Sequence, residues 1–332
     1  MATSRGSFHG PPLLELTMEN FTSNTIRMNT QGESRRARFL MERLITHVHD
    51  FIRETRLSTG EWRVILGFMS RCSRRSDQFR NELLLLSDIL GISVLIDSID
   101  HPKPPNCTEG NVMGPCFTLK SPEVPSGTKI GTDPQGQDML VLCTVSDSAG
   151  RPLPGVKVDV WHTDSQGNYD MEYTDGMYTS ERGVLTSDGE GKFWFKDIKP
   201  EGYTITEHGP VGDLLRKLKR HPWRPGHMHF MFQKQGYDKL VTNLYMKGDP
   251  FEGSDALMGV KESLIVNPVK IDKDTAKKYG VWDDFLILRY DFVLATVEEV
   301  EQLRDRNALD AMHRLGFGRV VLEDHLPVPD LD

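Results

Sequence analysis

The sequence is poor in several features that would mark whole classes of protein. Its four cysteines (Cys72, Cys107, Cys116 and Cys143) are scattered without a C-x-x-C pair, which argues against a zinc ribbon and against a secreted disulfide framework. No apolar run approaches the roughly 18 residues that a membrane-spanning helix needs. The N-terminal "MATSRGSFHG" lacks the layout of a secretory signal. We therefore expect a reduced, cytoplasmic protein without a membrane span.

The chain also lacks an excess of positive charge, with 40 Lys and Arg against 48 Asp and Glu. The formal net charge is −8 over 332 residues, which argues against nucleic acid as a partner. The local exception is "DLLRKLKRHPWR" (213–224), a basic island that is usual for a solvated face but could also attract an anionic substrate. With 38% hydrophobic and 27% charged residues, the composition is typical of a globular protein.

Three stretches before residue 100 have the periodicity of helices. Apolar residues recur with a helical period in "SRRARFLMERLITHVHDFIRETRL" (34–57), and a shorter helix is indicated through "EWRVILGFMSR" (61–71). "SDQFRNELLLLSDILGISVLIDSI" (76–99) predicts a third helical region, interrupted at Gly91. Such helices can bury only one side against a sheet, so their remaining apolar surface indicates a dimer contact.

The composition changes at "DHPKPPNCTEGNVMGP" (100–115), where Pro, Gly and Asn mark a domain boundary. Beyond it, short apolar runs bounded by turn residues predict strands at 138–147, 155–163, 191–198, 227–233, 240–246, 263–271 and 285–295. Strands at this spacing predict a β-sandwich, and residues 296–318 a helix followed by an ordered tail. We therefore expect a mainly β protein, with a flexible N-terminal arm (1–33), a helical dimerisation domain (34–105) and a β-sandwich domain (106–332).

"RHPWRPGHMHF" (220–230) places two histidines one residue apart on a predicted strand. Residues i and i+2 of a strand point to the same face, so His227 and His229 aim together. The pair can begin a metal site, or it can be two ordinary polar residues of a strand. A metal would need a carboxylate for ferrous iron, a third histidine for zinc, or thiolates, for which no cysteine is near in sequence.

Two tyrosines follow glycine-containing turns at the ends of predicted strands. "GVKVDVWHTDSQGNYD" (155–170) presents Tyr169, and "FKDIKPEGYTITEHGPVG" (195–212) presents Tyr203 in the same way. Such tyrosines are normally packed aromatics with a wet hydroxyl. A ferric ion is a hard Lewis acid, however, and can remove the phenol proton despite a free pKa of about 10.

Three long segments carry a resemblance to a known family. "VDVWHTDSQGNYD" (158–170), "GPVGDLLRKLKRHPWRPGHMHF" (209–230) and "GDPFEGSDALMGVKESL" (248–264) resemble signature segments of the intradiol ring-cleavage dioxygenases of the catechol and hydroxyquinol type. The resemblance runs from about residue 35 to 295, in the expected order. It implies one non-haem Fe(3+) per chain, held by Tyr169, Tyr203, His227 and His229, and an active-site arginine at Arg224.

The resemblance also implies a catalytic role for two of these residues. A small aromatic diol and O2 are the expected partners, and the diol displaces Tyr203 from the iron whereas Tyr169 stays bound. The freed phenolate of Tyr203 accepts a substrate proton. Arg224 keeps its charge at all relevant pH values and stabilises negative charge on the substrate.

A substrate pocket is implied by position. Its residues are Leu85, Asp88, Val112, Met113, Gly114, Pro115, Cys116, Ile205, Thr206, Arg224, Asn243 and Leu257. An acid at Asp88 is similar to hydroxyquinol 1,2-dioxygenases, where it can accept a hydrogen bond from the third hydroxyl. A buried, unpaired carboxylate would cost on the order of a few kcal/mol, so Asp88 either meets such a partner or pairs within the helices. Cys116, Thr206 and Asn243 depart from the residues common at these positions and change the polarity or volume of the pocket.

The favoured function is therefore ring cleavage of hydroxyquinol (benzene-1,2,4-triol) to 3-hydroxy-cis,cis-muconate (maleylacetate), with conversion of catechol to cis,cis-muconate as the alternative. Two hypotheses of other classes stay open: a non-catalytic β-sandwich binding module, and a ferrous or zinc hydrolytic site of His227, His229 and Asp164. His162 could be a ligand on spacing alone, but the family pattern makes it structural. The resemblance further implies a homodimer through the helical domains, with a lipid-like molecule between them.

Overall fold

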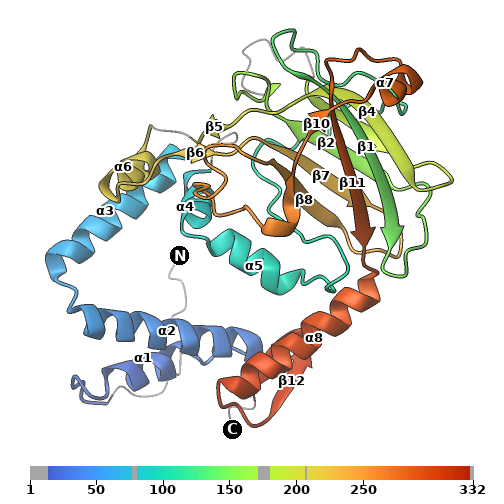
Figure 1. Ribbon diagram of the computed structural model, residues 1–332. Helices are drawn as coiled ribbons and strands as arrows, with labels where there is room; N and C mark the ends of the chain where they lie inside the picture. Colours follow the sequence, from blue (N-terminus) through green and yellow to red (C-terminus); the bar gives the residue numbers. More distant parts are fainter. Residues whose placement is uncertain (1–13, 77–80, 171–179, 206–207, 330–332) are drawn as a thin grey trace, which may run out of the picture. The chain divides into compact units, whose positions relative to one another are not determined.

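A computed structural model of the chain describes residues 14–76, 81–170, 180–205 and 208–329 (Figure 1). Its contacts divide into two compact units, one formed by Met1–Gly67 with Arg304–Asp332 and the other by Phe68–Leu303. The residues that the sequence marks as a candidate site all belong to the second unit. The domain boundaries expected from the sequence, at 33/34 and 105/106, stay a prediction.

Two β-sheets form the body of the second unit (Figure 1). One contains β1 (Asp138–Asp147), β4 (Lys192–Ile198), β10 (Val269–Lys270) and β11 (Leu286–Leu294), in the order β10-β11-β1-β4. The other contains β2 (Lys157–His162), β3 (Arg182–Thr186), β7 (His227–Gln233), β8 (Leu240–Met246) and β9 (Ile265–Val266), in the order β3-β2-β7-β8-β9. A single apolar core takes side chains from both sheets, so the predicted β-sandwich is confirmed.

Strand β7 shows how the sandwich core and the candidate site share one strand. Met228, Phe230 and Phe232 belong to the core between the sheets, where Phe232 packs against Phe292 of β11 at 4.5 Å between ring centroids. Because side chains alternate along a strand, His227 and His229 point to the opposite face. Burial of each core phenylalanine contributes about 1.5–3 kcal/mol, so the histidines stand on a rigid element.

The segment 263–271, predicted as one strand, is instead a short 3-10 turn, η2 (Glu262–Leu264), followed by the two-residue strands β9 and β10. Pro268 lies between these strands and cannot donate a ladder hydrogen bond. β9 pairs with β8 in one sheet, whereas β10 pairs with β11 in the other. The segment therefore passes from one sheet to the other at the proline.

The second unit also contains the helices α3 (Thr59–Arg75, which begins in the first unit), α4 (Glu82–Ile89), α5 (Ile92–Asp100), α6 (Pro210–Lys217) and α7 (Lys273–Tyr279). Of these helices, α7 packs against the four-stranded sheet through Ala276 and Tyr279. The predicted interruption at Gly91 is confirmed, since this residue separates α4 from α5 with a φ of 71°, a conformation that favours glycine. The buried carboxylate of Glu82 accepts a hydrogen bond from the Val211 N–H at 3.0 Å and so joins α4 to α6.

The first unit contains α1 (Phe21–Asn29), α2 (Arg35–Thr55), most of α8 (Val297–Arg314) and a hairpin of β12 (Val320–Glu323) and β13 (Leu326–Pro329). Residues 21–29 fall in the segment predicted as a flexible arm, but they form a helix. The Thr22 hydroxyl accepts a hydrogen bond from Arg53 at 2.6 Å and lies 3.0 Å from His49 Nδ1. These tertiary contacts of α1 with α2 outweigh the weak helix propensity of a Ser-, Thr- and Asn-rich segment.

No helix within the described residues is both long enough and apolar enough to cross a membrane.

Candidate active site

His227 presents an unprotonated nitrogen to the face opposite the core. Its Nδ1 lies 2.7 Å from the backbone carbonyl oxygen of Pro225. A carbonyl oxygen can only accept, so Nδ1 carries the proton and Nε2 keeps its lone pair. Nε2 lies 3.2 Å from the Nε2 of His229. The two imidazoles thus direct metal-binding atoms to a common point.

His229 is held by the strands on both sides of β7. Trp161 of β2 stands opposite it and stacks on the imidazole, with ring centroids 4.8 Å apart and planes at 1°. Asn243 of β8 is its partner on the other side. That pairing is loose, because neither Asn243 Oδ1 nor His229 Nδ1 has a partner of hydrogen-bonding geometry, although the amide still opposes the lowering of the His229 pKa.

A tight turn after β2 delivers Tyr169 to the histidines. The carboxylate of Asp164 accepts hydrogen bonds from the backbone N–H groups of Gln166 and Asn168 at 2.8 and 2.9 Å, the pattern of an Asx turn. Gly167 has a φ of 81°, and a Cβ there would lie 2.8 Å from Tyr203 Cβ. Only glycine permits this approach, which leaves the Tyr169 hydroxyl 3.2 Å from His229 Nε2.

Tyr203 joins the cluster from the opposite side of that turn. It lies on β5 (Tyr203–Thr204), which pairs with β6 (Trp223–Arg224) so that Tyr203 stands directly opposite Arg224. Arg224 Nη1 donates to the Tyr203 hydroxyl at 3.2 Å and lies 3.1 Å from His227 Nε2. The rings of Tyr169 and Tyr203 meet edge to face at 5.5 Å. The structure therefore brings together all five residues expected at the centre.

The electrostatics of the cluster keep its four donor groups neutral. Burial, together with the charge of Arg224, lowers the pKa of both His227 and His229 well below the usual value. Burial also raises the pKa of the Tyr169 phenol well above its usual value and raises that of Tyr203. Two neutral imidazoles and two un-ionised phenols can serve as ligands only to a cation strong enough to displace the phenol protons.

This donor set fits a ferric ion. A hard trivalent cation favours phenolate oxygen, and it supplies the charge that would offset the burial of two phenolates. The hypothesis of a hydrolytic His-His-Asp site fares worse. Among the residues that the structure describes, no group of three or more His, Cys, Asp or Glu side chains could hold a metal. The Asp164 carboxylate is instead engaged by the backbone of its own turn.

His162 lies apart from the four donors. Its Nε2 is 2.9 Å from Asp197 Oδ1, with both side chains fully buried, and its Nδ1 is 2.7 Å from the Thr163 carbonyl oxygen. Burial alone would lower the pKa of His162, but the charge and hydrogen bond of Asp197 outweigh it and raise the pKa. Each ring nitrogen thus faces an oxygen atom, Nδ1 in a hydrogen bond with Thr163 and Nε2 in an ion pair with Asp197, and neither is directed to the four donors.

The residues expected to line a substrate pocket fall into two apolar groups around the tyrosines. Leu85, Ile205 and Leu257 pack in one group with Tyr203, whereas Met113 and Cys116 pack in the other with Tyr169 and Tyr203. Gly114 lies against His229, because a Cβ there would be 3.2 Å from its Cε1. Val112 is partly buried and Pro115 exposed, and neither belongs to these groups. Thr206 lies outside the described residues.

Asp88 is a buried carboxyl near the cluster, with 8% of its surface exposed. Burial raises its pKa, and a hydrogen bond with Ser93 and the charge of Arg224 oppose the rise. Asp88 lies one turn after Leu85 on α4, and the charge of Arg224 acts on its carboxyl. This carboxyl is therefore suited to bind a polar substituent of an aromatic ring.

Sequence patterns did not single out several residues that build the centre. Asp255 holds Arg224 in a buried ion pair at 3.0 Å. Arg182 donates to Asp170 at 2.6 Å and to the Cys116 carbonyl oxygen at 3.3 Å, and thereby joins the loop of Tyr169 to the loop of Gly114. Trp161 carries the stacking contact with His229. Only Trp161 had a usable signal, since it lies near the end of the strand that precedes the Tyr169 turn.

Comparison with known proteins identifies the family that this chain resembles. Residues 34–108 match the family model "Catechol dioxygenase N terminus", and residues 112–296 match the model "Dioxygenase". The chain is 51% identical to the intradiol ring-cleavage dioxygenase hqdA of Aspergillus niger over 97% of this chain and 98% of that protein. It is 36% identical to 6-chlorohydroxyquinol 1,2-dioxygenase of Cupriavidus pinatubonensis, over 84% of this chain and 98% of the relative.

A solved structure is also similar. Hydroxyquinol 1,2-dioxygenase of Pseudomonas putida DLL-E4 superposes with a TM-score of 0.77 and 36% identity, over 83% of this chain and 97% of that one.

Proposed function

Because this chain belongs to the intradiol ring-cleavage dioxygenase family, an enzyme family that opens aromatic diols with O2, we propose that its substrate is hydroxyquinol and its product 3-hydroxy-cis,cis-muconate. Membership in this family excludes the hypothesis that the chain is a non-catalytic β-sandwich binding module. The single observation that carries the choice of hydroxyquinol is the buried carboxyl of Asp88, which lies one turn after Leu85 on α4. Similarity to relatives named as acting on hydroxyquinol and 6-chlorohydroxyquinol supports the same choice.

The cofactor in this proposal is one non-haem Fe(3+), held by Tyr169, Tyr203, His227 and His229. The support is the convergence of their four donor atoms, with neighbouring separations of 3.2 Å between Tyr169 Oη and His229 Nε2 and between the two imidazole Nε2 atoms. When bound, the ferric ion acts as a Lewis acid that ionises the diol and draws electron density from it, which activates the ring toward O2.

The protein's own groups have separate tasks. Tyr203 Oη is the proposed proton acceptor for a substrate hydroxyl, and its position opposite Arg224 keeps it within 3.2 Å of the guanidinium. Arg224 Nη1, buried and unable to lose its proton, stabilises negative charge that develops on the substrate oxygens. The apolar residues Leu85, Ile205 and Leu257 exclude water and orient the ring.

Asp88 is the proposed specificity residue. A carboxyl buried among apolar side chains gains from a hydrogen bond to the third hydroxyl of hydroxyquinol, which catechol lacks. Catechol would leave Asp88 with its hydrogen bond to Ser93 but without the further one that the third hydroxyl would donate, and a buried polar group with unused hydrogen-bonding capacity disfavours such a ligand. Catechol should therefore be the poorer substrate.

Oxygen uptake on hydroxyquinol and catechol tests this assignment. In Asp88→Leu we expect the ratio of kcat/KM for hydroxyquinol over catechol to fall at least about tenfold, the value of one lost hydrogen bond of roughly 1.4 kcal/mol. Asp97→Leu on α5 is the matched control and should leave the ratio unchanged. A wild-type preference for catechol would assign the substrate to the catechol class instead, whereas an unchanged ratio in Asp88→Leu would refute the role of Asp88.

The expected homodimer is also a proposal. On α4 and α5 the large apolar residues Leu83, Leu84, Leu90, Ile92, Leu95, Ile96 and Ile99 are exposed in the isolated chain. A second copy, with a lipid-like molecule between the two, would cover this surface. Light scattering should report a dimer for the wild type and a monomer for Ile96→Glu; an unchanged mass in that variant would show that the interface lies elsewhere.

The cytoplasmic location stays a prediction.

A further inference from the structure

Every N–H group of the Arg224 side chain has a defined direction. On one edge of the guanidinium, Nε donates to Asp255 Oδ1 at 3.0 Å and Nη2 donates to Asp255 Oδ2 at 3.2 Å. Nη2 also donates to the Tyr245 hydroxyl at 3.3 Å. These contacts occupy the edge that faces away from the centre. Nη1 alone remains for the centre, where it meets Tyr203 and His227.

Asp255 is itself fixed from four directions. Besides the two bonds from Arg224, it accepts the backbone N–H of Leu257 at 3.1 Å and that of Gly259 at 2.9 Å. Its side chain is 2% exposed. Burial alone would raise the pKa of Asp255, but the Arg224 charge and these hydrogen bonds outweigh it and lower the pKa. A charged carboxylate with a bidentate arginine partner holds planar geometry better than a neutral group would.

The loop that carries Asp255 wraps closely around the guanidinium. A Cβ at Gly259 would lie 2.6 Å from the Tyr245 hydroxyl oxygen and 3.2 Å from Arg224 Nη2, so no larger residue fits there without movement. The same loop carries Leu257, which packs in the apolar group of Tyr203. One carboxylate therefore orders both the arginine and a side chain of the expected pocket.

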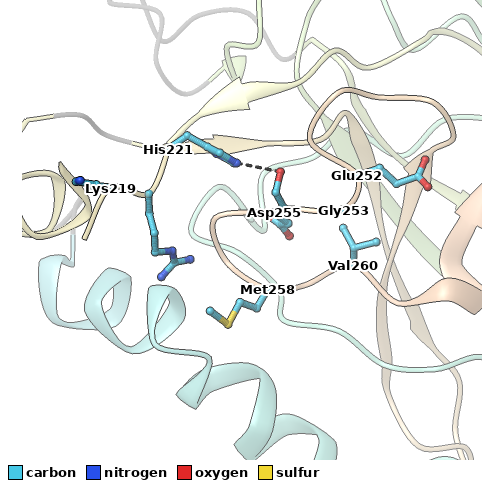
Figure 2. A pocket seen from close by; sticks show the side chains of 9 residues that line it. Lys219, His221, Glu252, Gly253, Asp255, Met258 and Val260 are labelled. Carbon is cyan, nitrogen blue, oxygen red and sulfur yellow. Dashed lines mark hydrogen bonds between the residues drawn. The ribbon is translucent and has the colours of Figure 1, made fainter. Parts of the chain in front are cut away.

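The other side of this loop faces a cavity of about 650 Å³, lined by Lys219, Arg220, His221, Glu252, Gly253, Ser254, Asp255, Met258 and Val260 (Figure 2). There the hydroxyl of Ser254 lies 2.9 Å from His221 Nε2 (dashed in Figure 2). The loop is thus held at Ser254 by His221 and at Ala256, whose carbonyl oxygen accepts from Arg220 Nη2 at 2.8 Å, whereas the Asp255 carboxylate binds Arg224. Among these contacts of the loop, only those of the Asp255 carboxylate reach the Arg224 side chain.

We propose that Asp255 is a positioning residue of the ring-cleavage reaction: it orients Arg224 so that Nη1 donates to the Tyr203 oxygen, and it sets the place of Leu257 through the same carboxylate. This inference rests on the proposed iron centre and its ligand Tyr203. Asp255 does not touch the substrate. It acts through the guanidinium, which would otherwise be free to rotate its N–H groups away from the phenol oxygen.

The test is Asp255→Asn in iron-loaded protein, followed by absorption spectroscopy and kinetics. The amide keeps the size of the carboxylate, but its NH2 group must face two N–H groups in either orientation. We expect kcat to fall about 10–100-fold, the usual effect of losing a group that orients a metal ligand's partner, with little change in KM. The tyrosinate-to-iron band should move to longer wavelength, because a phenolate that loses a hydrogen bond is a stronger electron donor.

Two further variants separate positioning from general loosening of the loop. Ser254→Ala removes the contact with His221 on the cavity side and should leave both kcat and the band unchanged. In a double-mutant cycle, Asp255→Asn should add less than about twofold to the loss in an Arg224→Gln background, because its effect passes through the arginine. Asp255→Glu keeps the charge and should restore part of the lost kcat and part of the band position.

The outcomes are distinct from those that test the iron centre. A wild-type protein that is loaded with iron but lacks the band would sink the proposed function, whatever Asp255→Asn does. A normal wild-type band with an unshifted band and kcat within twofold in Asp255→Asn would overturn the positioning role alone. If Asp255→Asn does not fold, Asp255→Glu decides: a shifted band and lowered kcat support the role, and wild-type values refute it.

Discussion

Two kinds of buried histidine lie on neighbouring strands of one sheet, and their surroundings give them opposite properties. His227 and His229 on β7 face a guanidinium and two phenols, and their pKa values are lowered well below normal by burial and by the charge of Arg224. His162 on β2 faces the carboxylate of Asp197, which raises its pKa against the effect of burial. The sign of the nearest charge therefore decides whether a buried histidine keeps a lone pair that can bind a metal or forms a buried ion pair.

The comparison explains why residue type and strand position are poor guides to a ligand. By spacing alone His162 is as good a candidate as His229, since both end or lie on strands that pair directly. The decisive difference is what occupies the second ring nitrogen. His227 gives one nitrogen to a backbone carbonyl and keeps the other unprotonated, where it faces the donor Arg224 Nη1, whereas His162 has an acceptor at each nitrogen.

The largest contrast is expected when each histidine is replaced by leucine. His229→Leu removes one proposed ligand of the iron, so we expect iron content to fall and kcat to drop by at least about 10³-fold, the equivalent of several kcal/mol of lost metal assistance. His162→Leu in the folded state should keep one iron per chain. Metal analysis with oxygen uptake measures both; equal loss of iron in the two variants would break the contrast.

The free energy of unfolding should change in the reverse order, with the larger loss in His162→Leu and the smaller in His229→Leu. His162→Leu leaves the fully buried Asp197 without its partner, and breaking a buried pair in this way costs about 3–5 kcal/mol of unfolding free energy. Chemical denaturation of metal-free protein measures it. His313→Leu, which removes an exposed histidine near the end of α8, is the control and should change stability by less than about 0.5 kcal/mol. A loss below 1 kcal/mol in His162→Leu would contradict the assignment of a structural ion pair.

A substitution in the turn before Tyr169 should have a smaller effect, which is limited to the proposed iron centre. Gly167→Ala forces a Cβ into a φ of 81° and to within 2.8 Å of Tyr203 Cβ, so we expect about 1–3 kcal/mol of strain and a weakened tyrosinate band. Gly155→Ala has a similar φ of 67° but nothing within 4 Å. Its cost should be limited to the left-handed backbone, with an unchanged band. Equal behaviour of the two alanine variants would show that the close approach to Tyr203 is unimportant.

The smallest effects are opposite slopes of stability against pH. The folded-state pKa of His162 is raised, so its stabilisation is complete below the unfolded value of about 6.5 and is lost as pH rises through the folded value. The folded-state pKa values of His227 and His229 are lowered, so their contribution is lost as pH falls below about 6.5, where the unfolded chain binds protons that the fold excludes.

Denaturation of metal-free protein between pH 5 and 9 separates the two slopes. The difference between wild type and His162→Leu should shrink as pH rises, whereas that between wild type and His229→Leu should shrink as pH falls. Two differences that change in the same direction would refute the opposite environments.

The sandwich could be predicted from sequence wherever strands alternate cleanly. Residues 138–147, 227–233 and 240–246 were predicted with the bounds that β1, β7 and β8 have, because each strand is flanked by turn residues and has one face in the core. The segment 263–271 could not, since only the tertiary fold decides that Pro268 divides it between two sheets. Helix α1 was missed because its stability comes from Arg53 and His49 of another helix.

Residues of the candidate site could be predicted from the sequence where they lie close together along the chain. His227 and His229 follow from the two-residue period of a strand, while Tyr169 and Tyr203 required resemblance to a family, because nothing in spacing brings two turns together. Asp255 had no local signal: its role depends on a loop that folds back on Arg224 from 31 residues away. Such contacts between distant segments are where sequence patterns carry least information.

The absorption spectrum of the purified, iron-loaded protein tests the central claim most directly. Two phenolates bound to Fe(3+) should give a wine-red colour through tyrosinate-to-iron charge transfer, and Tyr169→Phe should bleach it while His162→Leu retains it. A protein that contains one iron per chain and is colourless would contradict the Tyr169, Tyr203, His227 and His229 centre.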